Sequence, residues 1–70
     1  MSQNLKNSLR EARHKGQGMT QQALADLVSV SRQSIIAIET GKYSPSLELA
    51  IKIAAVFDCE ISDLFWIEEK

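Results

Sequence analysis

The sequence predicts an all-α protein, a bundle of five short helices with room for a short C-terminal strand. Apolar residues recur every three or four positions through most of the chain, which is the spacing of one helix face. A serine or threonine that can cap a helix precedes three of these stretches, at Thr20, Ser31 and Ser46. Alternation with a period of two is confined to the tail, residues 66–70, so a strand is expected only there.

A first helix is expected from about Asn4 to Lys15. Leu5, Leu9 and Ala12 recur along this segment at helical spacing and would share one face. The tripeptide Gly-Gln-Gly at 16–18 then ends the helix, because glycine is a poor helix former.

Two short helices joined by a tight turn follow, at about 21–28 and 32–40. The apolar face of the first consists of Ala23, Leu24, Leu27 and Val28. In the second, Ile35 and Ile38 face inward, and Gly41 suits the helix end. Since only the segment 28–30 separates the two helices, they must cross steeply, which is helix-turn-helix geometry.

Two more helices complete the bundle. Pro45 disfavours helix in the residue before it, and Ser46 then caps a fourth helix. Its apolar residues are spaced at three and four, namely Leu47, Ala50, Ile51, Ile53, Ala54 and Phe57. A last short helix over Ile61–Phe65, capped by Ser62, leads into the tail.

Composition indicates one soluble domain over residues 1–70, with a core from about 5 to 65. Hydrophobic residues make up 44% of the chain, enough for a core. The single cysteine excludes an internal disulfide, which fits a reducing compartment. The start of the chain has no long apolar run, and no stretch reaches the roughly 18 apolar residues of a membrane span. We therefore expect a cytoplasmic protein without membrane contact.

Charge is divided unevenly along the chain. The net charge is −1, which by itself argues mildly against nucleic-acid binding. Residues 1–45, however, hold six Lys and Arg against three Asp and Glu, a net of +3. Residues 46–70 hold two against six, a net of −4. Because salt screens fields beyond about 8–10 Å, the local charge governs phosphate binding, and the first half can bind DNA while the second faces away.

Fragments spread along residues 5–65 resemble the phage Cro/repressor-like, or XRE-type, helix-turn-helix family in their order and spacing. They are Leu9-Arg10, Arg13, Gly18-Met19-Thr20-Gln21, Leu24-Ala25, Val30-Ser31-Arg32, Ile35, Ile38-Glu39, Gly41, Tyr43, Pro45-Ser46-Leu47, Ile53-Ala54 and Leu64-Phe65. The resemblance implies a repressor-like bundle of five helices. It also implies sequence-specific binding to duplex DNA and dimeric action as a transcription regulator.

The resemblance places the base contacts in the second helix of the motif. Ser31 as a cap puts Arg32 and Gln33 in the first turn, which enters the major groove in a helix-turn-helix. Arginine can bond guanine O6 and N7 together, and glutamine can bond adenine N6 and N7. Ser34 and Ala37 continue this face and are small enough for close approach to the bases. The alternative interpretation is a solvated helix start.

Phosphate contacts are implied on both sides of that helix. They fall on Thr20, Gln21, Thr40, Lys42, Tyr43 and Ser44. The amide of Gln21 could bond a phosphate and also brace a base-contacting residue. No cofactor is implied.

Arg13 and Glu39 match a pair that, in the family, forms an ion pair between the first and third helices. The alternative is two independent surface charges. The loop between Arg13 and Gln21 is one residue longer than usual, so Arg10 is an alternative partner for Glu39. A second departure is Ser29, where the family commonly has glycine. If that position needs a positive φ, serine costs modest strain.

Catalysis finds little support in the sequence. His14 and Cys59 are the only histidine and the only cysteine. Nucleophilic catalysis would need them side by side with an orienting group, and no metal site has enough soft ligands. A buried neutral thiol is a commoner state for a lone cysteine than a redox sensor.

The tail carries the strongest signal for a partner. Five large apolar residues lie within seven positions there, namely Ile61, Leu64, Phe65, Trp66 and Ile67. Leu64 and Phe65 are expected to complete the core, whereas Trp66 and Ile67 cannot both face inward from a terminal segment, and exposed large apolar residues mark association surfaces. We therefore expect a homodimer, joined through Phe65, Trp66 and Ile67, that represses from a roughly palindromic operator. The alternatives are an antitoxin-like regulator whose C-terminal end binds a partner protein, a helical interaction module without a DNA role, and a tail folded over its own core.

Overall fold

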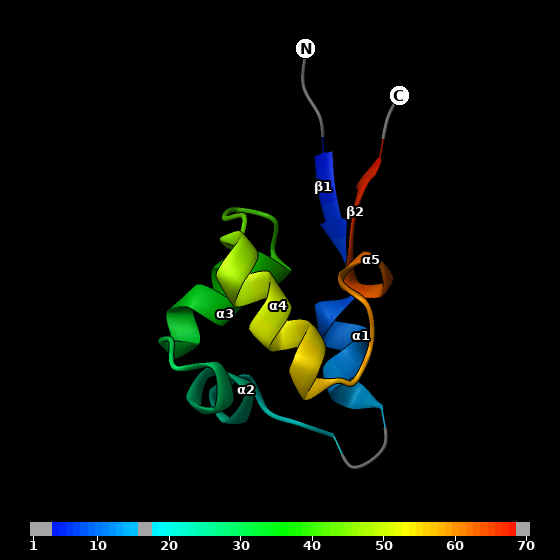
Figure 1. Ribbon diagram of the computed structural model, residues 1–70. Coiled ribbons are helices and arrows are strands. Elements are labelled where there is room, and N and C mark those ends of the chain that lie inside the picture. The colour runs from blue at the N-terminus through cyan, green and yellow to red at the C-terminus, as the bar shows by residue number, and fades with distance from the viewer. Residues whose placement is uncertain (1–3, 16–17, 69–70) are drawn as a thin grey trace.

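Five helices and a two-stranded ribbon make up the part of the chain that the computed structural model describes, residues 4–15 and 18–68 (Figure 1). The helices are α1 (Leu9–His14), α2 (Gln21–Val28), α3 (Arg32–Glu39), α4 (Leu47–Val56) and α5 (Ile61–Leu64). The strands are β1 (Asn4–Asn7) and β2 (Phe65–Glu68). The prediction of a five-helix, mainly α fold with a short C-terminal strand is therefore confirmed.

The helices enclose one apolar core. Its members come from all five helices and from the first residue of β2: Leu9, Leu24, Ala25, Val28, Ile35, Ile38, Leu49, Ala50, Ile53, Ala54, Leu64 and Phe65. Burying such side chains contributes roughly 1.5–3 kcal/mol for each large aliphatic residue. The core fixes α3 through Ile35 and Ile38, which leaves the other face of α3 in solvent.

The first helix is shorter than the sequence predicts, because residues 4–7 form a strand instead of its first turn. β1 pairs antiparallel with β2, and Leu5 lies opposite Ile67. The Ser8 N–H donates to the Leu64 carbonyl (2.9 Å), and Asn7 Nδ2 donates to the Ile38 carbonyl (3.0 Å). These long-range contacts outweigh the local helical spacing of Leu5, and α1 begins only at Leu9. Of the Gly-Gln-Gly segment, residues 16 and 17 lie outside the described residues.

Two details of the later helices also differ from expectation. Ser62 lies inside α5 and does not cap it; Glu60 holds the position before the helix, and its N–H donates to Asp63 Oδ2 (3.0 Å). In α4 the buried residues are Leu49, Ala50, Ile53 and Ala54, so Leu49 joins the predicted inward face, whereas Leu47 and Ile51 are exposed. The run Leu47–Val56 is apolar nearly all round, so spacing alone did not identify its buried face.

Candidate nucleic-acid interface

The helix-turn-helix is built by two helix caps and one left-handed residue. Thr20 Oγ1 accepts from the Ala23 N–H (2.9 Å) at the start of α2. Ser31 Oγ accepts from the Ser34 N–H (3.2 Å) at the start of α3. Between them Ser29 adopts φ 63° and ψ 44°, the conformation that glycine adopts at least cost. The turn therefore requires a positive φ, and serine supplies it.

The first turn of α3 presents its polar side chains to solvent. Arg32 and Gln33 are exposed, while Ser34 and Ala37 are partly buried further along the helix. The Ser34 hydroxyl lies 3.2 Å from the Ser31 hydroxyl. The four residues that the sequence assigns to base contacts therefore start at the N-terminal end of α3, where the side chains of Arg32 and Gln33 are accessible to solvent.

The end of α3 holds the segment assigned to phosphate contacts. Gly41 has φ 81°, and the Lys42 N–H donates back to the Ala37 carbonyl (2.9 Å), which closes the helix. Lys42, Tyr43 and Ser44 follow and are all exposed. The Thr40 hydroxyl donates to the Ile36 carbonyl (2.9 Å), so its proton is engaged within the helix. The Thr20 hydroxyl only accepts, which leaves its proton free for an outside acceptor.

A buried ion pair links α1 to the end of α3. Arg13 Nε lies 2.5 Å from Glu39 Oε2, and Arg13 Nη2 donates to Glu39 Oε1 (3.0 Å). The two side chains are only 7% and 6% exposed. Arg13 Nη1 also donates to the Met19 carbonyl (2.8 Å), and Gln21 Nε2 donates to Glu39 Oε1 (3.2 Å). Arg13, and not Arg10, is therefore the partner of Glu39, and the pair fixes the start of α2 against α3.

Arg10 and His14 lie instead on an exposed depression beside α3. Its volume is about 500 Å³, and it is lined by Arg10, Arg13, His14, Thr20, Gln21, Gln22, Arg32, Glu39 and Thr40. Sequence reasoning considered Arg10 only as an ion-pair partner and His14 only as a catalytic group. Their spacing of four positions on one helix was the signal that they share a face.

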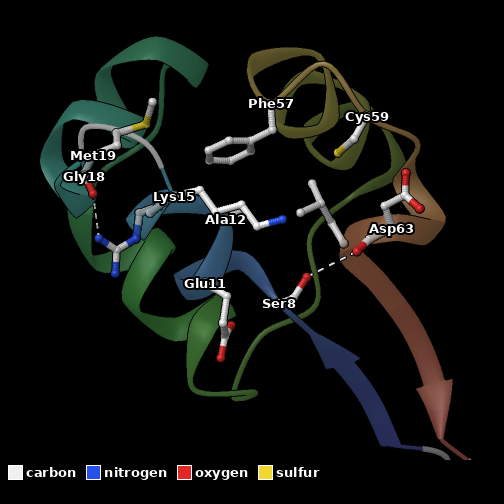
Figure 2. Close-up of a pocket in the computed structure, with 11 residues that line it drawn as sticks. Ser8, Glu11, Ala12, Lys15, Gly18, Met19, Phe57, Cys59 and Asp63 are labelled. Atoms are coloured by element: carbon white, nitrogen blue, oxygen red, sulfur yellow. Dashed lines mark hydrogen bonds between the residues drawn. The ribbon is translucent and has the colours of Figure 1, made fainter.

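Cys59 lies in a separate, larger groove. The groove holds about 940 Å³ between α1, the segment before α2, and the turn from α4 to α5. In Figure 2 Met19 and the Phe57 ring lie on one side of the groove, and Cys59 and Asp63, a residue of α5, lie on the other. Partial burial, followed by the carboxylates of Asp63, Asp58 and Glu60, raises the pKa of the Cys59 thiol, while Lys15 opposes the shift. His14 and Cys59 thus line different cavities, and the thiol is held in its protonated form.

The tail residues have different environments. Phe65 is buried in the core of its own chain, as the sequence predicts, and this burial does not fit its assignment to a dimer interface. Trp66 and Ile67 are 44% and 51% exposed. As neighbours in a strand they point to opposite faces of the ribbon. Ile67 shares its face with Leu5, whereas Trp66 shares its face with Lys6.

Within residues 4–15 and 18–68, no group of three or more His, Cys, Asp or Glu side chains is placed to hold a metal ion. In that part of the chain, no helix has the length and apolar character needed to cross a bilayer.

Comparison with known proteins agrees with this geometry. A family model described as helix-turn-helix matches residues 9–64, from the start of α1 to the end of α5. The chain is 48% identical over 66 residues to an uncharacterized HTH-type transcriptional regulator of Archaeoglobus fulgidus, covering 94% of this chain and 93% of that protein. It is 44% identical to another from Bacillus subtilis, with 94% and 98% covered. A competence pilus inhibition repressor of Acinetobacter baylyi is 36% identical, with 79% and 50% covered. The chain belongs to the XRE-type helix-turn-helix family of transcriptional regulators.

Proposed function

We propose that this regulator is a homodimeric repressor that binds a specific duplex operator through α3. The observation that carries the proposal is the exposed first turn of α3, where Arg32 and Gln33 project from a helix whose opposite face is locked in the core. Side chains at this position of a helix-turn-helix reach the base edges of the major groove. Ser34 and Ala37 lie behind them and would contact the bases at closer range.

The residues assigned to phosphate contacts differ in whether they still have a proton to donate. Thr20 has a free hydroxyl proton, and exposed Lys42, Tyr43 and Ser44 follow α3. Gln21 Nε2 donates one proton to Glu39, and its second proton would donate to a phosphate. Thr40 is the weakest of the assigned contacts, because its proton already bonds the Ile36 carbonyl.

Repression and dimerisation rest on different observations. The relative from Acinetobacter baylyi is named a repressor, which supports the same sign of regulation here. Ile67 is exposed and lies opposite the partly buried Leu5, so it continues the apolar face of the ribbon beyond the core, which supports a second copy as its cover. A dimer would present two α3 helices to two half-sites about 34 Å apart.

The test begins with selection of a preferred site from random duplexes by the wild-type protein. Arg32→Ala and Gln33→Ala should each cost about 1–3 kcal/mol on the selected site and little on random DNA. Lys52→Ala is the charge-matched control, because Lys52 lies on α4 and pairs with Glu48 (3.5 Å). Equal losses on selected and random DNA would assign Arg32 and Gln33 to the phosphates. A wild type that selects no site would refute the proposed function. Placing the selected site over a reporter promoter then tests the sign of regulation.

A further inference from the structure

We propose that α1 adds a phosphate-binding site to the DNA interface, formed by Arg10 and His14 together with Arg32. The inference rests on the proposed DNA binding and deepens it, because it assigns a ligand to a depression between α1 and the helix-turn-helix. Arg10 and His14 are one helical turn apart and both exposed. The depression that they line continues across the start of α2 to Arg32, at the start of α3.

The depression has a surplus of positive charge. Its lining includes three guanidinium groups, those of Arg10, Arg13 and Arg32, against the single carboxylate of Glu39. That carboxylate is already bonded by Arg13 and by Gln21, and it is almost fully buried. Among the described residues, no ion pair involves Arg10 or Arg32. Their charges are therefore available to an anion from outside the protein.

The position of the depression identifies that anion as a backbone phosphate. Arg32 belongs at once to the lining and to the first turn of α3, so DNA that admits this turn to its major groove brings a flanking strand past Arg10 and His14. Guanidinium groups bind phosphate oxygens through paired hydrogen bonds, and the N–H of an imidazole ring adds a further donor. Lys42 would hold the backbone at the opposite end of α3, so the two sites would straddle the helix.

His14 adds a donor to the same site. It lies one helical turn from Arg10 on α1 and lines the depression with it. A ring N–H of histidine can donate to a phosphate oxygen. The site would therefore combine the guanidinium groups of Arg10 and Arg32 with one imidazole donor.

The experiment compares Arg10→Gln and His14→Gln with Lys15→Gln. Lys15 is the matched control because it lies next to His14 but lines the Cys59 groove instead. Affinity for the selected site and for a random duplex is measured across a salt series. Unchanged melting temperatures would show that each variant is folded, which the exposure of these side chains predicts.

We expect Arg10→Gln to weaken binding to both duplexes and to reduce the salt slope by about 0.9, the value for one lost phosphate contact. His14→Gln should weaken binding to both duplexes by less than Arg10→Gln does, because the Arg10 guanidinium stays in place. Lys15→Gln should retain the wild-type affinity and slope. If Arg10→Gln and His14→Gln behave like Lys15→Gln while Arg32→Ala still loses specificity, the phosphate site is refuted and the proposed function stands. If the wild type binds neither duplex, both are refuted.

Discussion

Glu39 is the residue on which the geometry of the interface depends. Its two oxygens accept from Arg13 on α1 and from Gln21 on α2, so one carboxylate joins three helices. The position of each arginine on α1 explains why Arg13, and not Arg10, is the partner of Glu39. Arg13 lies four positions after Leu9, on the inward face of α1, whereas Arg10 is turned away by one position.

Replacing Glu39 with alanine should destabilise the fold by about 3–5 kcal/mol, because it leaves the buried Arg13 guanidinium without a counter-charge. Urea denaturation measures the loss. Glu48→Ala is the control: Glu48 pairs with Lys52 but is 81% exposed, so its removal should change the free energy of unfolding by less than about 0.5 kcal/mol. Equal effects of the two substitutions would show that Arg13 is solvated. Glu39→Gln, which keeps the shape, serves if the alanine variant does not fold.

Cys59 should react slowly with alkylating reagents. The thiolate is the reactive form, and burial together with Asp63, Asp58 and Glu60 raises the pKa of this thiol. At pH 8 the folded protein should therefore carry less thiolate than the urea-unfolded chain. The alkylation rate should also rise at a higher pH in the folded protein. Asp63→Asn should restore part of the rate. A folded protein that reacts as fast as the unfolded chain would point to an activated cysteine.

At the scale of elements, the sequence predicts the helix-turn-helix correctly but places a helical turn where the structure has β1. The helix-turn-helix is specified locally, because the caps Thr20 and Ser31 and the short turn lie within a few residues of the contacts they make. β1 is specified by distant partners, since Leu5 meets Ile67 and Ser8 bonds Leu64. Helical spacing at residues 5, 9 and 12 carried no information about these partners.

The left-handed turn residue gives a prediction about stability. Ser29→Gly should raise the free energy of unfolding by about 1 kcal/mol, since a residue with a Cβ is strained at φ 63°. Ser46→Gly is the same chemical change at a helix cap with φ −62°, where the loss of the bond to the Leu49 N–H should cost a few tenths of a kcal/mol. Thermal unfolding of both variants measures the difference. A lower melting temperature for Ser29→Gly would show that the Ser29 side chain stabilises the turn.

Lys42 tests the role of the segment after α3. Lys42→Ala should weaken binding to selected and random duplexes alike and reduce the salt slope by about 0.9, because the exposed ammonium would contact a phosphate and no base. Fluorescence anisotropy over a salt series gives the slope. Ser44→Ala provides a neighbouring exposed position without charge, where the slope should stay constant. An unchanged slope for Lys42→Ala would remove this lysine from the interface.

At the scale of the whole molecule, the ribbon decides how a second copy could attach. Phe65 belongs to the core, and Trp66 and Ile67 lie on opposite faces, so one flat contact cannot cover both. The face of Ile67 and Leu5 is apolar, whereas Trp66 shares its face with Lys6 and Glu68, whose charged groups lie 3.9 Å apart. The sequence predicts an association surface in the tail, and the strand pairing places Trp66 and Ile67 on its two different faces.

Sedimentation of single variants should show which face of the ribbon contributes to a dimer. Ile67→Ala should shift a dimer toward monomer and lower DNA affinity sharply, because it removes apolar area from the unpaired face. Trp66→Ala should have a smaller effect, and the double variant should be monomeric. Leu47→Ala, at an exposed apolar position on α4, should leave the assembly unchanged. A wild type that stays monomeric at high protein concentration would instead favour a different protein as the partner.

The pairing of β1 with β2 also has a consequence for the order of folding. The ribbon joins residue 4 to residue 68, so closing it encloses almost every other element in one large loop. A two-stranded ribbon is barely stable alone, and contacts between distant residues form slowly. The bundle should therefore assemble first and the ribbon last, and the ribbon amides should exchange with solvent before those of α4. During synthesis β2 is also the last of these elements to leave the ribosome. If two copies join through the ribbon, a nascent chain cannot form a dimer with another copy until its α3 is already folded.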